Sequence, residues 1–448
     1  MTGDAVRVLA DRDEIHDIMM RYSHGVDQRE MEIVRACFAP DLTTVGWGPG
    51  EGFDRDALIR FISGVGHFRE TMHMMGNQLI EVSGDTASMD TFAQLTHRLD
   101  GDPEKLLVSS RYVEKLTRRD GEWAITQRGG EPAWAPNGVD GLRSDDPAVQ
   151  WLLDRAAIRD VVVRDTVLAD TAATGRVRNL LGTRLVTIDG DEAWAESYVL
   201  VTPIPDGEDR SRPADAITPV RWSDHVVRKD GRWRLESREV DGPGHLRALP
   251  MPPSTDDARV RALLDRAMVI DAVTALSYAI DHEDEGLLRA CVAPDVTVGE
   301  AEIGMVSGID ALLEVLRATM WAMDGTWLFM NNHLVEIGGD EAEARADARV
   351  AEAQSTDLGV DDATVQSYVF IIERPAGASE PLSWTEGARR FVDRLQRDGD
   401  GWRVVERRVE TNVMPDEKVM QRPEGEQSIE AMTRRAEARA REQDDESE

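Results

Sequence analysis

The stretch TMHMMGNQLIE, residues 71–81, alternates in a way that predicts a β-strand at the heart of the first third of the chain. A period of two places His73, Met75 and Asn77 on one face of this strand. If that face lines a cavity, an imidazole stands among thioethers with an amide nearby, which suits proton transfer in a dry pocket. A histidine on an apolar face is also often simply packed and hydrogen-bonded, so this stretch alone leaves both interpretations open.

Amphipathic helices are expected before this strand, over residues 13–26, 31–38 and 54–65, with a short strand at 42–45 between the last two. Strands are expected over 72–82, 86–97, 107–118 and 123–128. Helices followed by an antiparallel sheet predict an α+β domain with its helices on one face of a curved sheet. In such a sheet His97 either approaches His73 from the neighbouring strand or lies at the exposed strand end, before a turn.

The chain repeats itself. DRDEIHDIMMRYSHGVD (11–27) returns as DRAAIRDVVVRDTVLAD (154–170), and RACFAPDLT (35–43) returns as RACVAPDVT (289–297). We expect domains at 1–135, 146–245 and 256–414. The second is shortened by the loss of its second helix, short strand and third helix. The third carries a loop insertion at roughly 357–386, and a charged tail over 415–448 is expected to be a solvated helix or disordered.

Composition excludes several classes of protein. The chain has 448 residues and a net charge of −33, from 85 acidic and 52 basic residues, so it repels nucleic acid and anionic membrane surfaces. No apolar run reaches the ~20 residues of a membrane span and no secretory signal opens the chain, so a cytoplasmic location is expected. The two cysteines, Cys37 and Cys291, exclude a disulfide framework, and without CxxC or HExxH no metal site is predicted.

The first copy resembles the SnoaL-like branch of the nuclear-transport-factor-2-like superfamily. The resemblance is carried by DEIHDIMMRYSHGVD, FAPD, TMHMMGNQLIEVSGDTA and RYVEKLTRRDGEWAI, in this order over most of residues 8–129. It implies tandem cone-shaped α+β barrels, each a curved antiparallel sheet around helices with an apolar pocket, the second copy being truncated. The family includes scytalone dehydratase, a dehydrochlorinase, ketosteroid isomerase, polyketide cyclases and members without catalysis, so fold alone does not decide function.

The resemblance also implies site residues. Asp27 is similar to the family's pocket aspartate and His73 to the histidine of a T-x-H signature, which dehydratase members use as a dyad. In that dyad the carboxylate orients the imidazole and stabilises its charged form. Tyr22 resembles the tyrosine of a bile-acid dehydratase, and His97 falls near a second catalytic histidine. Looser candidates for substrate contacts are Asn77, Arg111, Trp47 and Met75.

The sister copies are a control for this assignment. The third copy keeps Asp281 and an asparagine, Asn332, but the residues aligned with Tyr22, His73 and His97 are Leu276, Leu328 and Glu352. The second copy has Asp170, with Asp165, Asn179 and Pro203 at those three positions. The aspartate–histidine pair is therefore complete in one copy of three, which favours a functional His73 over one needed for packing.

The leading hypothesis is a cofactor-independent lyase (dehydratase) or isomerase that acts on a hydrophobic, hydroxylated ring compound such as a steroid, polyketide or aromatic. His73 would take a proton from carbon, and Tyr22, helped by His97, would donate to the departing hydroxyl or polarise a carbonyl. The alternative is a non-catalytic small-ligand-binding or assembly protein. A metal-dependent hydrolase using His67, His73 and His97 matches no standard ligand spacing. The other copies are expected to act as a scaffold, either as a pseudo-trimer within one chain or in a homo-oligomer.

Overall fold

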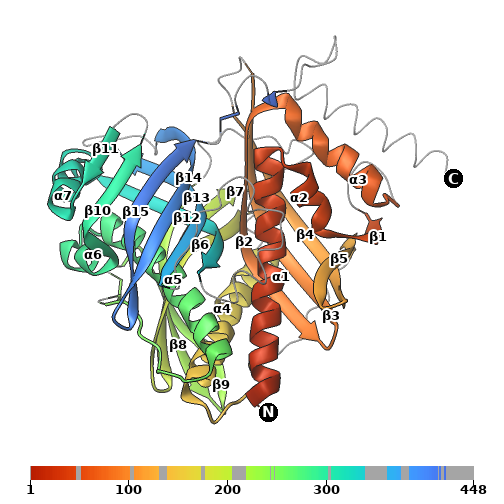
Figure 1. Cartoon of the computed structure of the whole chain (residues 1–448), viewed down its shortest axis with the longest axis horizontal. Coiled ribbons are helices and arrows are strands. Elements are labelled where there is room, and N and C mark those ends of the chain that lie inside the picture. The colour runs from red at the N-terminus through yellow and green to blue at the C-terminus, as the bar shows by residue number, and fades with distance from the viewer. Residues whose placement is uncertain are drawn as a thin grey trace.

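Three copies of one α+β unit follow each other along the chain and lie side by side in space (Figure 1). The computed structural model describes residues 2–46, 52–100, 105–130, 139–172, 177–203, 218–242, 244–246, 248–300, 304–338, 361–374, 383–411, 413–414 and 418–419. Each copy pairs a long helix with its own curved, largely antiparallel sheet. This is the tandem α+β architecture that the sequence predicts.

The first copy contains helices α1 (Thr2–Gln28), α2 (Met31–Ala36) and α3 (Arg55–Ile62). Its strands are β1 (Phe38–Val45), β2 (Phe68–Ser83), β3 (Thr86–Leu99), β4 (Lys105–Arg119) and β5 (Glu122–Gly129), in the sheet order β1-β5-β4-β3-β2. Helix α1 begins well before the predicted residue 13, because Ala5 and Leu9 pack into the hydrophobic core of the second copy.

The second copy contains α4 (Pro147–Ala172) and strands β6 (Val177–Asp189), β7 (Glu192–Pro203), β8 (Thr218–Lys229) and β9 (Arg232–Val240). The strands form a sheet in the order β6-β7-β8-β9. Only residues 173–176 separate α4 from β6, so counterparts of α2, β1 and α3 are missing from this copy.

The third copy contains α5 (Ala258–Asp281), α6 (Glu285–Cys291) and α7 (Ile309–Ala318). Its strands are β10 (Val292–Glu300), β11 (Gly304–Ser307), β12 (Gly325–Ile337), β13 (Asp362–Arg374), β14 (Ser383–Asp398) and β15 (Gly401–Thr411). The sheet order is β11-β10-β15-β14-β13-β12.

Two sequence predictions for this copy need correction. The predicted loop insertion at 357–386 contains the whole of β13 and the start of β14. The long connection instead precedes β13, at 339–360, outside the described residues. In the first copy Thr71 pairs with His97, and in the third Thr326 pairs with Glu373, so Glu373 rather than Glu352 is the counterpart of His97. The alignment failed because motif matching cannot measure the length of a connection. The tail prediction for 415–448 falls almost wholly outside the described residues.

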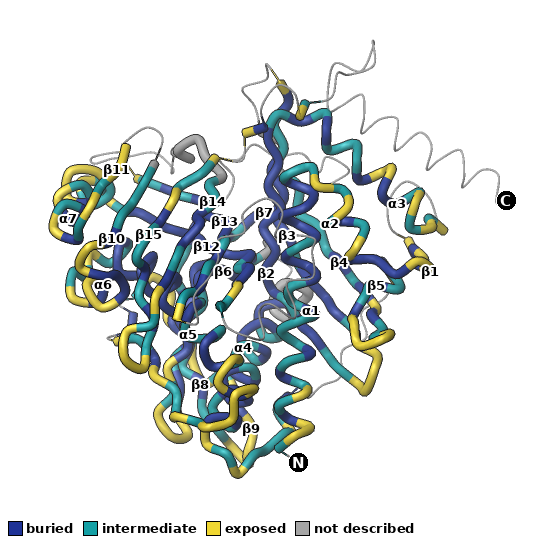
Figure 2. Tube along the Cα trace, viewed as in Figure 1, coloured by how far each residue is buried: buried dark blue, intermediate teal, exposed yellow. Residues whose placement is uncertain are grey.

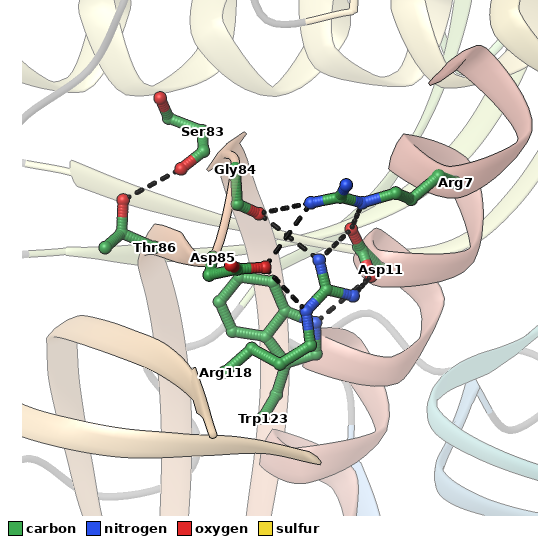
Figure 3. Close-up of polar contacts among 8 residues, drawn as sticks. All are labelled: Arg7, Asp11, Ser83, Gly84, Asp85, Thr86, Arg118 and Trp123. Atoms are coloured by element: carbon green, nitrogen blue, oxygen red, sulfur yellow. Dashed lines mark hydrogen bonds and ion pairs between the residues drawn. The ribbon is translucent and has the colours of Figure 1, made fainter. Parts of the chain in front are cut away.

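The same polar cluster ties the long helix to the last hairpin in every copy. In the first copy Arg118 and Trp123 both contact Asp11 of α1, with the indole Nε1 3.2 Å from Oδ1, and Arg118 also bonds Asp85 in the β2–β3 turn (Figure 3). Arg228 and Trp233 meet Asp154 in the second copy, and Arg397 and Trp402 meet Asp265 in the third. A buried carboxylate needs such partners, and the threefold recurrence marks this cluster as structural.

The helices of the three copies are joined in a closed ring of ion pairs. Arg12 of α1 reaches Asp160 of α4, Arg155 of α4 reaches Asp271 of α5, and Arg266 of α5 returns to Asp17 of α1. The three nitrogen–oxygen distances are 2.7, 2.6 and 2.5 Å. Each copy therefore contacts the next in the same way, and the third contacts the first. The ring closes within one chain; a further homo-oligomer stays a prediction.

Strands β2, β6 and β12 meet at the centre of the molecule, where they are buried (Figures 1 and 2). Each carries a β-bulge with one residue in left-handed geometry, Asn77 (φ 47°), Thr183 (φ 44°) or Asn332 (φ 55°). We call these three the bulge residues. Met72 and Met74 on the outer face of β2 belong to the hydrophobic core of the third copy, which explains why both faces of this strand are apolar.

The side chain of each bulge residue forms hydrogen bonds with backbone groups of the next copy. The Asn77 amide donates to the Asn179 carbonyl (2.6 Å) and accepts from the Leu181 amide (2.7 Å). In the same way, the Thr183 hydroxyl donates to one backbone carbonyl of β12 and accepts from one backbone amide there, and the Asn332 amide does so on β2. The bulge breaks the strict alternation that placed Asn77 on the His73 face, because the left-handed residue turns its side chain toward the neighbouring copy.

Candidate active site

Asp27 and His73, which lie 46 residues apart in sequence, meet in the interior of the first copy. The side-chain Oδ1 of Asp27 is 2.6 Å from Nδ1 of His73, and Oδ2 accepts the backbone N–H of the same residue at 2.8 Å. Asp27 is 0% and His73 is 3% exposed. Two bonds to one carboxylate hold the imidazole in place, with Nδ1 turned toward Asp27.

The end of helix α1 positions Asp27. The chain leaves the helix at Arg29, which is left-handed (φ 65°), and the Glu30 amide bonds the Gly25 carbonyl at 2.7 Å. The Arg29 guanidinium then bonds the Thr71 hydroxyl (2.8 Å) and the Phe68 carbonyl (3.1 Å) at the start of β2. These contacts align the last turn of α1 with β2, so that Asp27 points inward. Sequence reasoning missed Arg29. This residue joins the end of α1, which carries Asp27, to the start of β2, which carries His73.

Burial by itself raises the pKa of the Asp27 carboxyl, but the charge and the hydrogen bonds of the neighbouring imidazole lower it below its usual value. His97 lies next to the dyad on β3, with its ring centroid 5.5 Å from that of His73, and it stacks on Phe68 at 4.7 Å. Burial, followed by the charge of His73, lowers the pKa of His97 to about 3. His97 is therefore a neutral ring beside His73, and among the described residues its Nδ1 has no hydrogen-bond partner.

Tyr22 belongs to a different cluster. Its ring lies 4.2 Å from the Arg128 guanidinium carbon and edge-on to Tyr112 at 5.9 Å, and Arg128 is paired with buried Glu114 at 2.7 Å. The other copies repeat this arginine–carboxylate pair as Arg238–Asp224 and Arg407–Asp393. Within the described residues no hydrogen bond or ring contact joins Tyr22 to His73. The structure therefore places Tyr22 in the packing of the cone.

Three of the four candidates for substrate contacts lie in the described part of the chain, and Asn77 and Arg111 are engaged in other contacts. Met75 is buried and its backbone amide bonds Asn332. Asn77 bridges to the second copy. Arg111 forms a two-bond ion pair with Asp90 (2.9 and 2.6 Å) and lies over Phe92. Trp47 lies outside the described residues. Among the residues that the structure describes, no group of three or more His, Cys, Asp or Glu side chains could hold a metal ion.

No helix of the described chain is long and apolar enough to cross a membrane. A cytoplasmic location stays a prediction.

A family model matches the chain once in each of the three copies. The model of the SnoaL-like domain matches residues 7–129, 134–239 and 261–408. An uncharacterized protein of Mycobacterium tuberculosis is 29% identical over 128 residues, covering 28% of this chain and 86% of the relative. A candidate scytalone dehydratase from Novosphingobium aromaticivorans is 27% identical, covers 27% of this chain and 82% of its own, and has a TM-score of 0.25.

A hexachlorocyclohexane dehydrochlorinase from Novosphingobium barchaimii is 22% identical over 29% of this chain and 91% of its own, also with a TM-score of 0.25. Since the matched residues cover most of the sequence in three successive blocks, the chain belongs to the SnoaL-like domain family and carries the domain three times.

Proposed function

We propose that the first copy is a cofactor-independent lyase or isomerase, in which His73 removes a proton from a carbon atom of a hydrophobic, hydroxylated ring compound. The observation that carries this proposal is the buried 2.6 Å contact between Asp27 Oδ1 and His73 Nδ1. An imidazole held by a buried carboxylate is a competent general base, because the carboxylate stabilises the imidazolium that forms when Nε2 accepts the proton.

His97 is the residue proposed to act at the substrate oxygen. Its lowered pKa, about 3, keeps the ring neutral, so it can donate an N–H hydrogen bond to a carbonyl or hydroxyl oxygen without competing with His73 for the proton. The T-shaped contact between the two rings, with centroids 5.5 Å apart, supports a role for both at one small substrate. Tyr22 supports the cone through Arg128 in this proposal.

Substrate entry requires an opening beside the dyad, because His73 is 3% exposed in the closed structure. In this proposal the opening is bordered by the imidazole of His97 on β3 and the ring of Phe68 at the start of β2, which stack with their centroids 4.7 Å apart. Movement of this pair would admit a flat apolar ring to the Nε2 side of His73 and would exclude water again on closure.

A non-catalytic role is the second candidate. The observation that favours it is the burial of both Asp27 and His73 away from solvent. A buried aspartate bonded to both the backbone and the ring of one histidine also has the features of a structural pair that fastens a helix to a sheet. The two candidates differ in whether Nε2 of His73 exchanges protons with a bound carbon acid.

Hydrogen exchange into carbon tests the proposal. The purified protein would be incubated in deuterated water with a panel of hydroxylated steroids, polyketide fragments and aromatic alcohols, and mass spectrometry would detect uptake of deuterium or loss of water. We expect one class of compound to react with the parent and with His333→Gln, a change of a half-buried histidine in the third copy. His73→Gln should abolish the reaction. Equal reaction by His73→Gln would refute the assignment of the base, and an inert parent across all classes would favour the non-catalytic role.

A further inference from the structure

The helices of the closed ring carry a second set of matched residues. On each of α1, α4 and α5 the residue directly before the aspartate of the ring is half-buried, although the three helices pack against one another. These residues are His16, Arg159 and Ile270. At one position of the ring the second copy therefore has an arginine, where the first has a histidine and the third an isoleucine.

The central strands supply three more residues at matching positions. On β2, β6 and β12 the residue directly after the bulge residue is half-buried, whereas the bulge residues themselves are buried. These residues are Gln78, Arg184 and His333. The Gln78 Oε1 lies 2.6 Å from Nδ1 of His16, so the strand position faces the helix position. We call these six residues the centre of the ring.

Hydrogen bonds on both sides fix the backbone of Arg184 beside the ring. The hydroxyl of the bulge residue before it bonds β12. Two residues after it, the Val186 carbonyl accepts from the ring residue Arg155 at 3.1 Å. In the first copy the Ile80 carbonyl accepts from the ring residue Arg12 in the same way. Arg184 therefore holds the position from which the strand residue of the first copy reaches its ring helix.

The centre of the ring lies among charged groups that are not fully paired. In the described part of the chain, the charged groups that interact there are Arg12, Arg155, Arg159, Arg184, Arg266, Asp13, Asp17, Asp160 and Asp271. Three arginines and three aspartates of this set form the ring itself. The remaining aspartate, Asp13, lies 3.6 Å from Arg266 and its side chain is 43% exposed. Two arginines are left over.

Arg159 is the first of these two. Its ion pair is with Asp271 at 3.8 Å, beyond hydrogen-bonding distance, and that carboxylate already bonds Arg155 at 2.6 Å. Its Nε has no hydrogen-bond partner among the described residues. Burial, followed by the charge of Arg155, lowers the pKa of Arg159 to about 9. The guanidinium is charged at neutral pH without a carboxylate of its own.

Arg184 is the second. It forms no hydrogen bond or ion pair with any residue that the structure describes. The negative charge that acts on it is that of Asp160, which already bonds Arg12 at 2.7 Å. Burial lowers the pKa of Arg184 to about 10. The histidines of the centre add no charge near pH 7, because burial lowers the pKa of His16 to about 4 and that of His333 to about 3.

We infer that the centre of the ring binds a small oxyanion, which Arg159 and Arg184 of the second copy hold where the three copies meet. A planar guanidinium donates paired N–H bonds to the oxygens of phosphate, sulfate or a carboxylate, so an anion between the two arginines supplies the partner that each lacks. The Arg159 side chain is 31% exposed, so an ion can reach it from solvent. His16 precedes Asp27 by about 16 Å along α1, and this site does not rest on the proposed function.

Isothermal titration calorimetry tests the inference with inorganic phosphate as the probe, added to the whole chain in a chloride buffer of constant ionic strength near pH 7. We expect the parent to bind one phosphate per chain. Arg184→Gln, which copies Gln78 of the first copy, should weaken this binding at least about tenfold, because a charged donor is lost. Arg234→Gln makes the same change of charge at an exposed arginine of the second copy and should bind as the parent does. No binding by the parent, or equal binding by Arg184→Gln, would overturn the inference.

A second variant keeps the test open if Arg184→Gln does not fold. Arg159→His copies His16 of the first copy, removes the other guanidinium and should also weaken phosphate binding at least about tenfold. NMR of ¹⁵N-labelled arginine side chains adds a direct measurement, because phosphate should shift the Nε signal of the parent that is missing from Arg159→His. If that signal did not move at saturating phosphate, the ion would bind elsewhere and the inference would be wrong.

Discussion

The first and third copies build the same frame around different chemistry. In the first, Oδ2 of Asp27 accepts the backbone amide of His73 at 2.8 Å; in the third, Oδ2 of Asp281 accepts the backbone amide of Leu328 at the same distance. The other oxygen differs. Asp27 Oδ1 meets an imidazole, whereas Asp281 Oδ1 has no hydrogen-bond partner among the described residues. Burial, offset in part by the Leu328 amide and Arg221, raises the pKa of Asp281 to about 7.

This difference separates two duties of one residue. The bond to the strand backbone is shared by both copies, so it fastens the end of the long helix to the sheet wherever the fold occurs. The bond to the ring occurs in the first copy, so it belongs to the proposed chemistry. An aspartate at this position therefore indicates the fold, and the aspartate together with the histidine indicates the candidate site.

The largest expected effect comes from replacing the matching aspartates of the first and third copies. Asp27→Asn keeps an acceptor for the His73 backbone amide but places an amide opposite Nδ1, which removes the charge that stabilises the imidazolium. We expect the carbon–hydrogen exchange found with the parent to fall by about 10²- to 10⁴-fold. Asp281→Asn, made at the matching position, should leave the exchange rate within about twofold. Equal losses in the two variants would show that the aspartate acts through stability alone.

The next largest effect is expected from adding a histidine beside Asp281, where the third copy has Leu328. Leu328 is 1% exposed and stands where His73 stands, so Leu328→His should place Nδ1 against the orphaned Oδ1 of Asp281. The charge of the new imidazole should then lower the pKa of Asp281 from about 7 to below 4, by about three pH units.

NMR of ¹³C-labelled aspartate, with Asp281→Asn to identify the resonance, measures this change. Leu328→Asn copies the second copy, where Asn179 holds the position, and serves as the polar control without a base. An unchanged Asp281 titration midpoint in Leu328→His would contradict this prediction. It would show that the two sites differ in more than the presence of a histidine.

The smallest effect concerns the boundaries between copies. His24 packs against Tyr368 where the third copy meets the first, and the matching residue where the second copy meets the third is Tyr278. Burial lowers the pKa of His24 from 6.5 to about 4. Between these pH values the unfolded chain binds a proton that the folded chain excludes, so the free energy of unfolding falls as the pH is lowered.

For His24 alone this loss should be about 1–2 kcal/mol between pH 6.5 and pH 5. Urea unfolding at the two pH values measures it. His24→Tyr copies the other boundary and should lose less stability over the same range; an identical loss would exclude His24 as the acid-sensitive contact.

Much of the first copy could be predicted from periodicity and motif order. The strand that carries His73 was predicted, and the predicted helix over 13–26 ended one residue before Asp27, which α1 includes. The direction of His97 toward the His73 face follows from register, because His97 pairs with Thr71 two residues before His73. The interpretation of Asn77 failed at the bulge. Period two assumes an unbroken strand, and one left-handed residue sends the side chain to another copy.

The local sequence therefore determined the elements of each copy and the threefold repeat, because hydrophobic periodicity and turn residues act over a few positions. The pairing of Asp27 with His73 was implied by the resemblance of the first copy to a known family. The tertiary structure decided that these two residues touch, that Asn77 and Arg111 serve other contacts, and that Asn332 and Tyr368 reach the first copy. Such contacts depend on how the copies close into a ring, and bonds between residues more than 250 positions apart leave no pattern along the chain.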